Sequence, residues 1–418
     1  MSDHDLGQVR SVVEAAVAAP MLEQVLQWSA VNSGSRNLAG LATMASLLTE
    51  AFGVLPGVLE RRPAHETTVI APDGREDALP LGDNLLLTVR PEAPLQLLFT
   101  GHMDTVFPVD STFRECRRDG DLLNGPGVAD MKGGIAVMLA ALRAFEGSPL
   151  HARVGYQVVL NSDEEIGSPG SAPLLREAAR GKQGAFTYEP SALPDGTLAG
   201  ARPGSGNFSI VVTGRSAHAG RNPADGRNAL LAAADIALRL EQLVSEGLTV
   251  NPARIDGGGP NNVVPDHAIL RVNMRPVSAD RQRVAEAALK RIVGAVAEVR
   301  EVTVHVHGGF GRPPKTLDPQ ALALLDLVGA CGRRLSQQIG WRDTGGVCDG
   351  NNIAACGVPV VDTMGVRGGA IHSPEEYLII PSLYERAALT ALLLCTLARD
   401  GMPRAGTLGR YNPIGMNA

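Results

Sequence analysis

Five residues able to bind a divalent metal are spread along the chain, each at the end of an apolar run or in a loop that follows one. They are His102, Asp130, Glu165, Glu189 and His372. Borderline divalent metals accept imidazole and carboxylate ligands together, and this set suffices for two zinc ions that share Asp130 as a bridge. One metal would be bound by His102, Asp130 and Glu189, and the other by Asp130, Glu165 and His372. We therefore predict a two-metal site.

A metal pair of this kind leaves positions open for a bridging water and lowers its pKa until hydroxide forms near neutral pH. A base must then accept the water's protons. Glu164 is the candidate, because neighbouring residues at a strand end point apart and Glu164 can face the water while Glu165 binds metal. Asp104, two residues after His102, can accept a hydrogen bond from the imidazole and fix which ring nitrogen faces the metal.

The same residues also have an ordinary interpretation. Taken singly, a histidine or a carboxylate is more often a surface residue or a hydrogen-bonded core residue than a metal ligand. The five positions lie far apart in the sequence, so no compact metal-finger spacing supports them. The metal hypothesis therefore depends on the combination and on a fold that brings the five together.

Apolar runs around these residues predict an open α/β sheet. The run 97–100 ends at Gly101, which places His102 and Asp104 just past the carboxyl end of a buried strand, where such sheets bind their ligands. Asp130 follows a Gly-Pro-Gly turn and precedes the helical run 135–145. Further strand-like runs cover residues 53–60, 84–89, 95–100, 156–160, 185–188 and 197–202, and helical patterns cover 6–53 and follow Met131 and Ser171. Strands interleaved with helices indicate a mostly parallel sheet covered by helices.

The pattern changes near Pro203 and returns after the Gly/Pro-rich segment 308–315. Between them we expect the order βαββαβ, with strands near 208–214, 248–255, 267–275 and 302–308 and helices near 224–243 and 279–299. This order is that of a ferredoxin-like domain of about 100 residues, which can fold by itself. We therefore predict a discontinuous catalytic domain, residues 1–203 and 312–418, interrupted by an inserted domain, residues 204–311.

The composition favours a globular protein that acts on small molecules. With 418 residues and 44% hydrophobic residues, the chain can form two domains with sizeable cores. The net charge of −6, without a long Lys/Arg block, argues against nucleic acid or an anionic membrane as the partner. Five cysteines without a CxxC pair indicate reduced thiols rather than a disulfide framework. The segment MSDHDLGQVR is unlike a signal peptide and no run of about 18 apolar residues occurs, so we expect a cytoplasmic protein.

Six sequence blocks carry a resemblance to a known family. In order they are GHMDTV, GPGVADMKGG, NSDEEIGSPGS, YEPS, TGRSAHAG and GAIHSPEEY. They resemble the signature blocks of the di-zinc metallopeptidases that include bacterial glutamate carboxypeptidase, acetylornithine deacetylase, succinyl-diaminopimelate desuccinylase and peptidase T. The resemblance extends from about Leu97 to Tyr377. It implies two Zn²⁺ on the five ligands above, Glu164 as general base and Asp104 as the carboxylate that orients His102, with Co²⁺ or Mn²⁺ as alternative metals.

The resemblance also implies roles for the inserted domain. In the family this domain acts as a lid and mediates dimerisation, and the histidine of the TGRSAHAG block stabilises the oxyanion in the partner's active site. That residue is His218 here, and a homodimer is expected. Asn262 and Arg275, thirteen residues apart around a hairpin-like segment, match the Asn and Arg that bind the free carboxylate of the substrate. Arg275 as an ordinary surface cation remains the alternative.

Three positions depart from the family pattern near the expected substrate pocket. Val347 and Cys348 stand where many members have a small residue and Ser, and Asn273 stands where an Asp is frequent. None of the three is an expected metal ligand, so they affect the substrate rather than the metals.

We therefore predict a zinc-dependent hydrolase that cleaves an amide or peptide bond in a small substrate with a free carboxylate, similar to glutamate carboxypeptidase. An N-acyl-amino-acid deacylase similar to acetylornithine deacetylase is the close alternative. A non-catalytic binding protein is less favoured, because all five ligands and Glu164 are present. A thiol enzyme is less favoured still, because none of the five cysteines has a His motif beside it.

Overall fold

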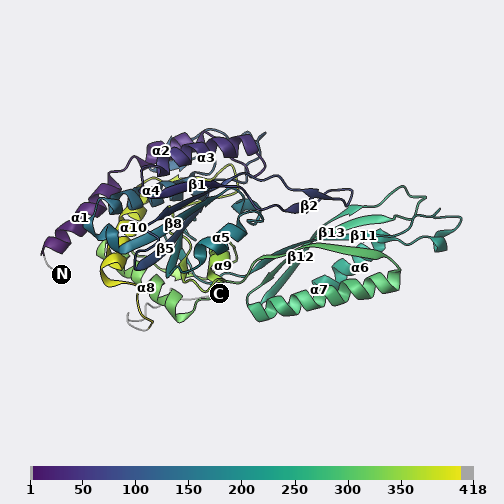
Figure 1. Cartoon of the computed structure of the whole chain (residues 1–418). Coiled ribbons are helices and arrows are strands. Elements are labelled where there is room, and N and C mark those ends of the chain that lie inside the picture. Colours follow the sequence, from purple (N-terminus) through teal and green to yellow (C-terminus); the bar gives the residue numbers. More distant parts are fainter. Residues whose placement is uncertain (1–2, 406–418) are drawn as a thin grey trace.

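A computed structural model describes residues 3–405, which form a large α/β unit and an elongated smaller unit beside it (Figure 1). The large unit contains a six-stranded sheet in the order β1-β4-β8-β5-β9-β16. Its strands are β1 (Val58–Arg62), β4 (Asn84–Val89), β8 (Val154–Asn161), β5 (Leu95–His102), β9 (Gly184–Thr187) and β16 (Val360–Val361). The strand β4 pairs antiparallel with both β1 and β8, and all other pairs are parallel. The sheet is therefore mixed, with β4 as the reversed strand in a mostly parallel arrangement.

Helices cover both faces of this sheet, and alternate side chains of each strand point to opposite layers. Leu97 and Phe99 of β5 belong to a large apolar core, whereas Leu98 between them belongs to a second core on the other face. The large core is formed with α1 (Asp3–Val17), α2 (Met21–Ser29), α3 (Leu38–Phe52), α4 (Gly133–Glu146), α8 (Pro319–Arg334) and α10 (Pro381–Asp400). The second core is formed with α5 (Ala172–Ala179) and α9 (Asp349–Ala354). The two cores therefore support the sheet, and the residues at its carboxyl edge, from both faces.

The smaller unit has a core of its own and lies in the chain between residue 204 and α8. Its elements are β11 (Ser205–Thr213), α6 (Ala229–Glu241), β12 (Leu248–Gly257), β13 (His267–Pro276), α7 (Ala279–Arg300) and β14 (Thr303–Arg312). The four strands form an antiparallel sheet in the order β12-β13-β11-β14. Ser278 starts α7 by accepting the backbone N–H of Arg281, which satisfies one of the free donors of the first turn. We call this unit, residues 205–312, the inserted unit.

Short elements complete the large unit. A second sheet contains β17 (Gly368–Gly369), β18 (Tyr377–Ile379), β7 (Leu122–Asn124) and β6 (Arg117–Asp119). Short helical turns cover Val128–Lys132 (η1), Pro149–Arg153 (η2) and Glu164–Ile166 (η3). A fourth turn, Pro223–Asp225 (η4), belongs to the inserted unit. The run 197–202, which we predicted as a further strand, forms only β10 (Leu198–Ala199), paired with β15 (Trp341–Arg342) outside the central sheet. No helix among the described residues is long and apolar enough to cross a membrane.

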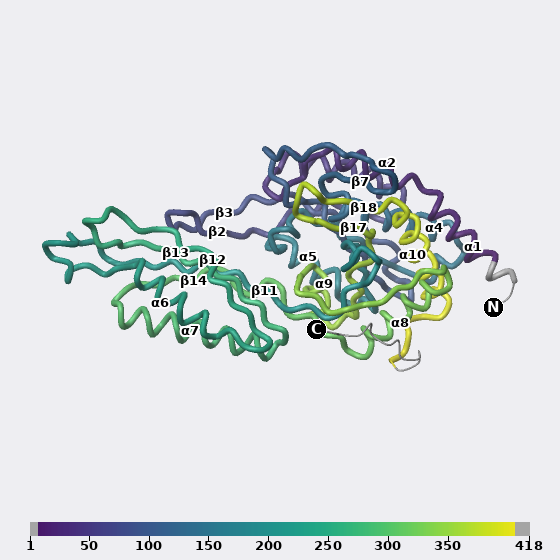
Figure 2. The backbone as a smooth tube through the Cα atoms, turned by 180° about the vertical axis from the view of Figure 1, so that it is seen from behind, coloured from purple at the N-terminus to yellow at the C-terminus, as the bar shows by residue number. Residues whose placement is uncertain are grey.

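A hairpin of the large unit reaches across to the inserted unit. It is formed by β2 (Thr68–Ile70) and β3 (Glu76–Ala78), and both views show it lying alongside β13 (Figures 1 and 2). Ile70 is buried against Val211 and Ile269 of the inserted unit, and Arg271 donates a hydrogen bond to the Ile70 carbonyl at 3.1 Å. We call residues 67–79 the hairpin arm. It provides a contact between the units in addition to the two chain crossings.

Candidate metal centre and substrate cavity

The five predicted metal ligands meet at the carboxyl edge of the central sheet. His102 is the last residue of β5, Glu165 lies in η3 after β8, and Glu189 follows β9 by two residues. Because β8, β5 and β9 are adjacent and parallel, their carboxyl ends lie side by side. Asp130 lies in η1 at the start of α4, and His372 lies in the loop between β17 and β18. The fold thus joins residues that are up to 270 positions apart, from His102 to His372.

Asp130 lies between the two histidines. Its Oδ1 is 3.1 Å from Nε2 of His102, and its Oδ2 is 3.3 Å from Nε2 of His372. Glu189 Oε2 completes the first group at 3.7 Å from Nε2 of His102, and Glu165 Oε2 completes the second at 3.2 Å from Nε2 of His372. The two oxygens of Asp130 therefore face different imidazoles, which is the geometry a bridging carboxylate needs.

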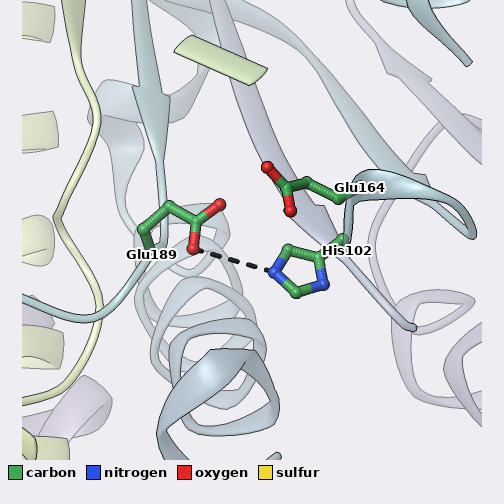
Figure 3. A group of neighbouring side chains, drawn as sticks. All are labelled: His102, Glu164 and Glu189. Atoms are coloured by element: carbon green, nitrogen blue, oxygen red, sulfur yellow. Dashed lines mark ion pairs between the residues drawn. The ribbon is translucent and has the colours of Figure 1, made fainter. Parts of the chain in front are cut away.

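Glu164 points toward the same space as His102 and Glu189 (Figure 3). One ligand atom from each of these three residues lies within 4.8 Å of the others, as do atoms of the group His102, Asp130 and Glu165. Asp130, Glu164, Glu165 and Glu189 thus place four carboxylates around two imidazoles. This excess of buried negative charge, with nitrogen and oxygen donors together, fits divalent cations.

Protonation in the cluster reflects the crowding of these carboxylates. Burial, followed by the charge of Asp130, raises the pKa of Glu165 to about 7. Hydrogen bonds to Asp130 and Glu165 raise the pKa of His372 to about 10. Burial alone would raise the pKa of Asp130, but the hydrogen bonds from both histidines outweigh it and hold that pKa well below its usual range. The histidines and carboxylates of the cluster therefore share protons, and a bound cation would displace those protons.

His372 stands on a backbone conformation that few non-glycine residues adopt. Its φ is 65°, in the left-handed region, and its side chain is 53% exposed. Such a backbone costs energy and persists where surrounding contacts impose it, often at functional sites. Here it directs the imidazole from a surface loop inward to Asp130 and Glu165.

Asp104 connects the first histidine to the loop of the base. Its carboxylate is fully buried and accepts hydrogen bonds from the Ser35 hydroxyl at 2.7 Å and from the backbone N–H of Glu164 and Glu165, both at 3.1 Å. Nδ1 of His102 is closer to the Asp104 carbonyl, at 3.0 Å, than to its carboxylate, at 3.4 Å. The carboxylate therefore organises the Glu164–Glu165 backbone more directly than it orients the imidazole.

Two charged residues that we did not predict complete the support of the site. Glu376 is buried and accepts the backbone N–H of Gly127, Ala129 and Asp130, which fixes the turn that carries Asp130. Arg312 pairs with the Glu164 carboxylate at 2.6 Å and donates to the Glu164 carbonyl at 2.8 Å. Glu376 belongs to the block GAIHSPEEY and could have been noted there, whereas nothing local marks Arg312, which is the last residue of β14.

A cavity of about 410 Å³ opens at the metal cluster. Its lining includes Glu164, Arg275 of the inserted unit, and two of the three departures from the family pattern, Val347 and Cys348. Cys348 is 3% exposed and packs near Asp362, so it forms part of the cavity wall. The cavity therefore lies between the two units, where a small substrate can contact both.

The structure does not bring His218 and Asn262 to this cavity. Both are exposed and lie next to each other, since the Ala219 N–H donates to the Asn262 carbonyl. Asn262 lies in a turn before β13 and Arg275 lies near the end of that strand, so most of the segment between them is an extended strand rather than a hairpin. At about 3.3 Å per residue, the eight residues from His267 to Arg275 alone span roughly 26 Å. Asn262 and Arg275 of one chain therefore do not meet at the cavity, and their shared role in binding a carboxylate stays a prediction.

Comparison with known proteins agrees with this geometry. Residues 98–396 match the sequence profile of Peptidase family M20/M25/M40. Carboxypeptidase G2 of Pseudomonas sp. (strain RS-16) is 30% identical over 326 residues, which cover 76% of this chain and 78% of that protein. A succinyl-diaminopimelate desuccinylase of Verminephrobacter eiseniae is 27% identical over 69% of this chain and 75% of its own. The family resemblance noted in the sequence is confirmed.

Solved structures share the fold. A tripeptidase of Staphylococcus aureus superimposes with a TM-score of 0.71 at 24% identity, over 91% of this chain and 98% of that one. Aminopeptidase PepT of Bacillus cereus gives a TM-score of 0.68 at 22% identity, over 90% and 98% of the two chains. Both matches include the mixed central sheet with its helices.

Proposed function

The chain belongs to peptidase family M20/M25/M40 and is a metal-dependent hydrolase, and we propose that it cleaves an amide bond in a small substrate with a free carboxylate, as glutamate carboxypeptidases do. The observation that carries the proposal is the position of Asp130 between His102 and His372, with Glu164 beside the first group. This arrangement suits two cations and a base that act on one water.

We infer that the physiological cofactor is a pair of Zn²⁺ ions. His102, Asp130 and Glu189 would hold one ion, and Asp130, Glu165 and His372 the other. Imidazole with carboxylate is a donor set that zinc accepts, and Co²⁺ or Mn²⁺ can replace it in similar sites. Bound ions would polarise the scissile carbonyl and lower the pKa of the attacking water.

We propose the following roles for three residues of the chain. Glu164 accepts a proton from the water and later gives it to the leaving amine. Arg275 binds the free carboxylate of the substrate and so places the amide at the cluster. His218 of the partner subunit donates a hydrogen bond to the oxyanion, in a homodimer formed through the inserted unit, which also acts as a lid over the cavity.

The similarity to desuccinylases supports a second candidate, an N-acyl-amino-acid deacylase similar to acetylornithine deacetylase. The two candidates differ only in the group on the carbonyl side of the scissile bond. The same cluster would serve both, because neither the base nor the proposed carboxylate contact changes.

A substrate panel separates the candidates. Metal-reconstituted protein is offered N-acetyl amino acids, dipeptides, and benzoyl- or folyl-glutamates, and release of the free amino acid is measured. Glu164→Gln is the inactive control, and Glu375→Gln, which changes an exposed neighbour of Glu376, is the matched active control. Turnover confined to peptides and acyl-glutamates supports the carboxypeptidase, and turnover confined to N-acetyl substrates supports the deacylase. Full metal binding with no turnover of any substrate would argue for a binding protein.

A further inference from the structure

Three arginines line the cavity at the metal cluster, and they differ in how their charges are compensated. Arg202 pairs with Asp362 at 2.7 Å, and Arg312 pairs with Glu164 at 2.6 Å. Arg275 has no ion pair with any carboxylate in residues 3–405. It is therefore the one arginine of the cavity lining whose charge is left for a ligand.

Arg275 is nevertheless held in place, by neutral acceptors. Its Nε donates to Oδ1 of Asn273 at 3.0 Å, and its Nη1 donates to the Gly345 carbonyl at 2.9 Å. Asn273 in turn is fixed through its amide nitrogen, which donates to Ser205 Oγ at 3.0 Å and to Asn207 Oδ1 at 2.8 Å. These bonds turn the amide oxygen of Asn273 toward Arg275. The guanidinium is thus oriented without being neutralised.

The position of Arg275 allows a bound ligand to reach this positive charge. Arg275 lines both the cavity at the metal cluster and a second cavity of about 540 Å³, which extends under the hairpin arm. The second cavity is lined mostly by uncharged polar side chains and glycines, among them Thr68, Asn207 and Asn273. A carboxylate at the junction would find one uncompensated cation, and hydrogen bonds from guanidinium to carboxylate are among the strongest in proteins.

We propose that Asn273 is a positioning residue that strengthens binding of substrates with a free carboxylate at this site, because its amide orients Arg275 and leaves the full positive charge for the substrate. The proposal rests on the function proposed above for Arg275. It also gives a role to a departure from the family pattern, since an Asp at position 273 would form an ion pair with Arg275 and compete with the substrate. Asn273 itself touches neither the metals nor the reacting atoms.

The test is an exchange of one neutral amide for a carboxylate of the same shape. Asn273→Asp puts a negative charge against Nε of Arg275, whereas Asn261→Asp adds the same charge at an exposed position outside the lining of both cavities. Each variant is combined with Glu164→Gln to prevent turnover. Binding of an N-acyl amino acid and of its primary amide to the metal-loaded protein is then measured by titration calorimetry.

We expect Asn273→Asp to weaken binding of the carboxylate ligand about 10- to 100-fold, the usual worth of a hydrogen bond to a charged group. Binding of the amide ligand should change little, and Asn261→Asp should leave both affinities close to those of the parent. With Glu164 restored, Asn273→Asp should raise KM for the free acid and leave kcat nearly unchanged. Equal loss for acid and amide, equal effects of the two Asp variants, or no discrimination between acid and amide by the parent would each overturn the proposal.

These readouts also separate this proposal from the proposed hydrolysis. Calorimetry requires no turnover, so a protein that hydrolyses nothing in the panel can still show the effect of Asn273→Asp on carboxylate binding. Conversely, hydrolysis with equal KM for acid and amide would support the enzyme and refute the role of Asn273. Thermal melting of both variants checks that the fold is unchanged.

Discussion

The buried carboxylate of Asp104 allows a prediction that can be worked from its contacts. It accepts three hydrogen bonds, one from the Ser35 hydroxyl and two from the backbone N–H groups of Glu164 and Glu165. In Asp104→Asn one oxygen becomes an NH₂ group that can no longer accept. Ser35 can reverse its hydroxyl and accept from that group, but a backbone N–H has no such freedom. Whichever way the amide is turned, one buried N–H of the Glu164–Glu165 segment loses its partner.

An unsatisfied buried N–H costs about 1–3 kcal/mol, and loss of the charge from the remaining bonds adds roughly 1 kcal/mol. We therefore expect Asp104→Asn to lower the free energy of unfolding of the metal-loaded protein by about 2–4 kcal/mol. The lost contact also frees the backbone that carries Glu165. We expect metal affinity to fall about 10- to 100-fold, as is typical when a group that supports a metal ligand is removed.

Chemical denaturation and metal titration with a competing chelator measure the two quantities. Asp110→Asn, which makes the same substitution at an exposed position six residues later, is the matched control and should change neither. Ser35→Ala removes the third bond without leaving a backbone N–H unpaired, so it should cost only about 1 kcal/mol. If Asp104→Asn costs no more than Ser35→Ala and retains full metal affinity, the hydrogen-bond reasoning is wrong.

Three further predictions follow from the supports of the site. Glu376→Gln should weaken metal binding about tenfold or more, because its carboxylate holds the turn of Asp130, while Glu375→Gln should not; equal affinities in a metal titration would contradict this. His218→Ala should lower kcat about 10²- to 10³-fold. When the His218→Ala and Glu164→Gln proteins are mixed, activity should return, because one site of each mixed dimer then has both residues intact. If activity does not return, both residues act in the site of one chain. Removal of metal with a chelator should lower the melting temperature, because free metal at a concentration of 1,000 times Kd stabilises the folded protein by about 4 kcal/mol. An unchanged melting curve would argue against a metal site in the folded state.

The positions of the metal ligands could be predicted because each follows a recognisable apolar run. The strand before His102 was predicted at 95–100 and extends to His102 itself, and the run 156–160 became β8, which leads to Glu165. A parallel arrangement of these strands was enough to expect their ends in one place. The antiparallel direction of β4 could not be predicted, because an apolar run of residues does not indicate in which direction its strand enters the sheet.

The supports of the site were harder to predict, because they depend on distances across the fold. Asp104 was expected to orient His102, and its carboxylate lies 3.4 Å from Nδ1 of that residue, but its contacts with the backbone of Glu164 and Glu165, sixty residues away in the chain, were not predicted. In the sequence Arg312 resembles any cation at the end of a strand, and its ion pair with Glu164 follows only from the fold, which brings the end of β14 to that residue. Asn262 and Arg275 had a suggestive spacing, but spacing alone does not tell a turn from a continuous strand.

The hairpin arm has a consequence for how this architecture can be rearranged. Ile70 is 2% exposed only because Val211 and Ile269 cover it, and Arg271 satisfies its carbonyl. Excision of residues 205–312, or their exchange for the same unit of a relative, would leave an apolar side chain and a short pair of strands without their partner surface. A functional chimera must therefore transfer residues 67–79 together with the inserted unit. In this lineage the two segments are expected to change together, although about 130 residues separate them in the chain.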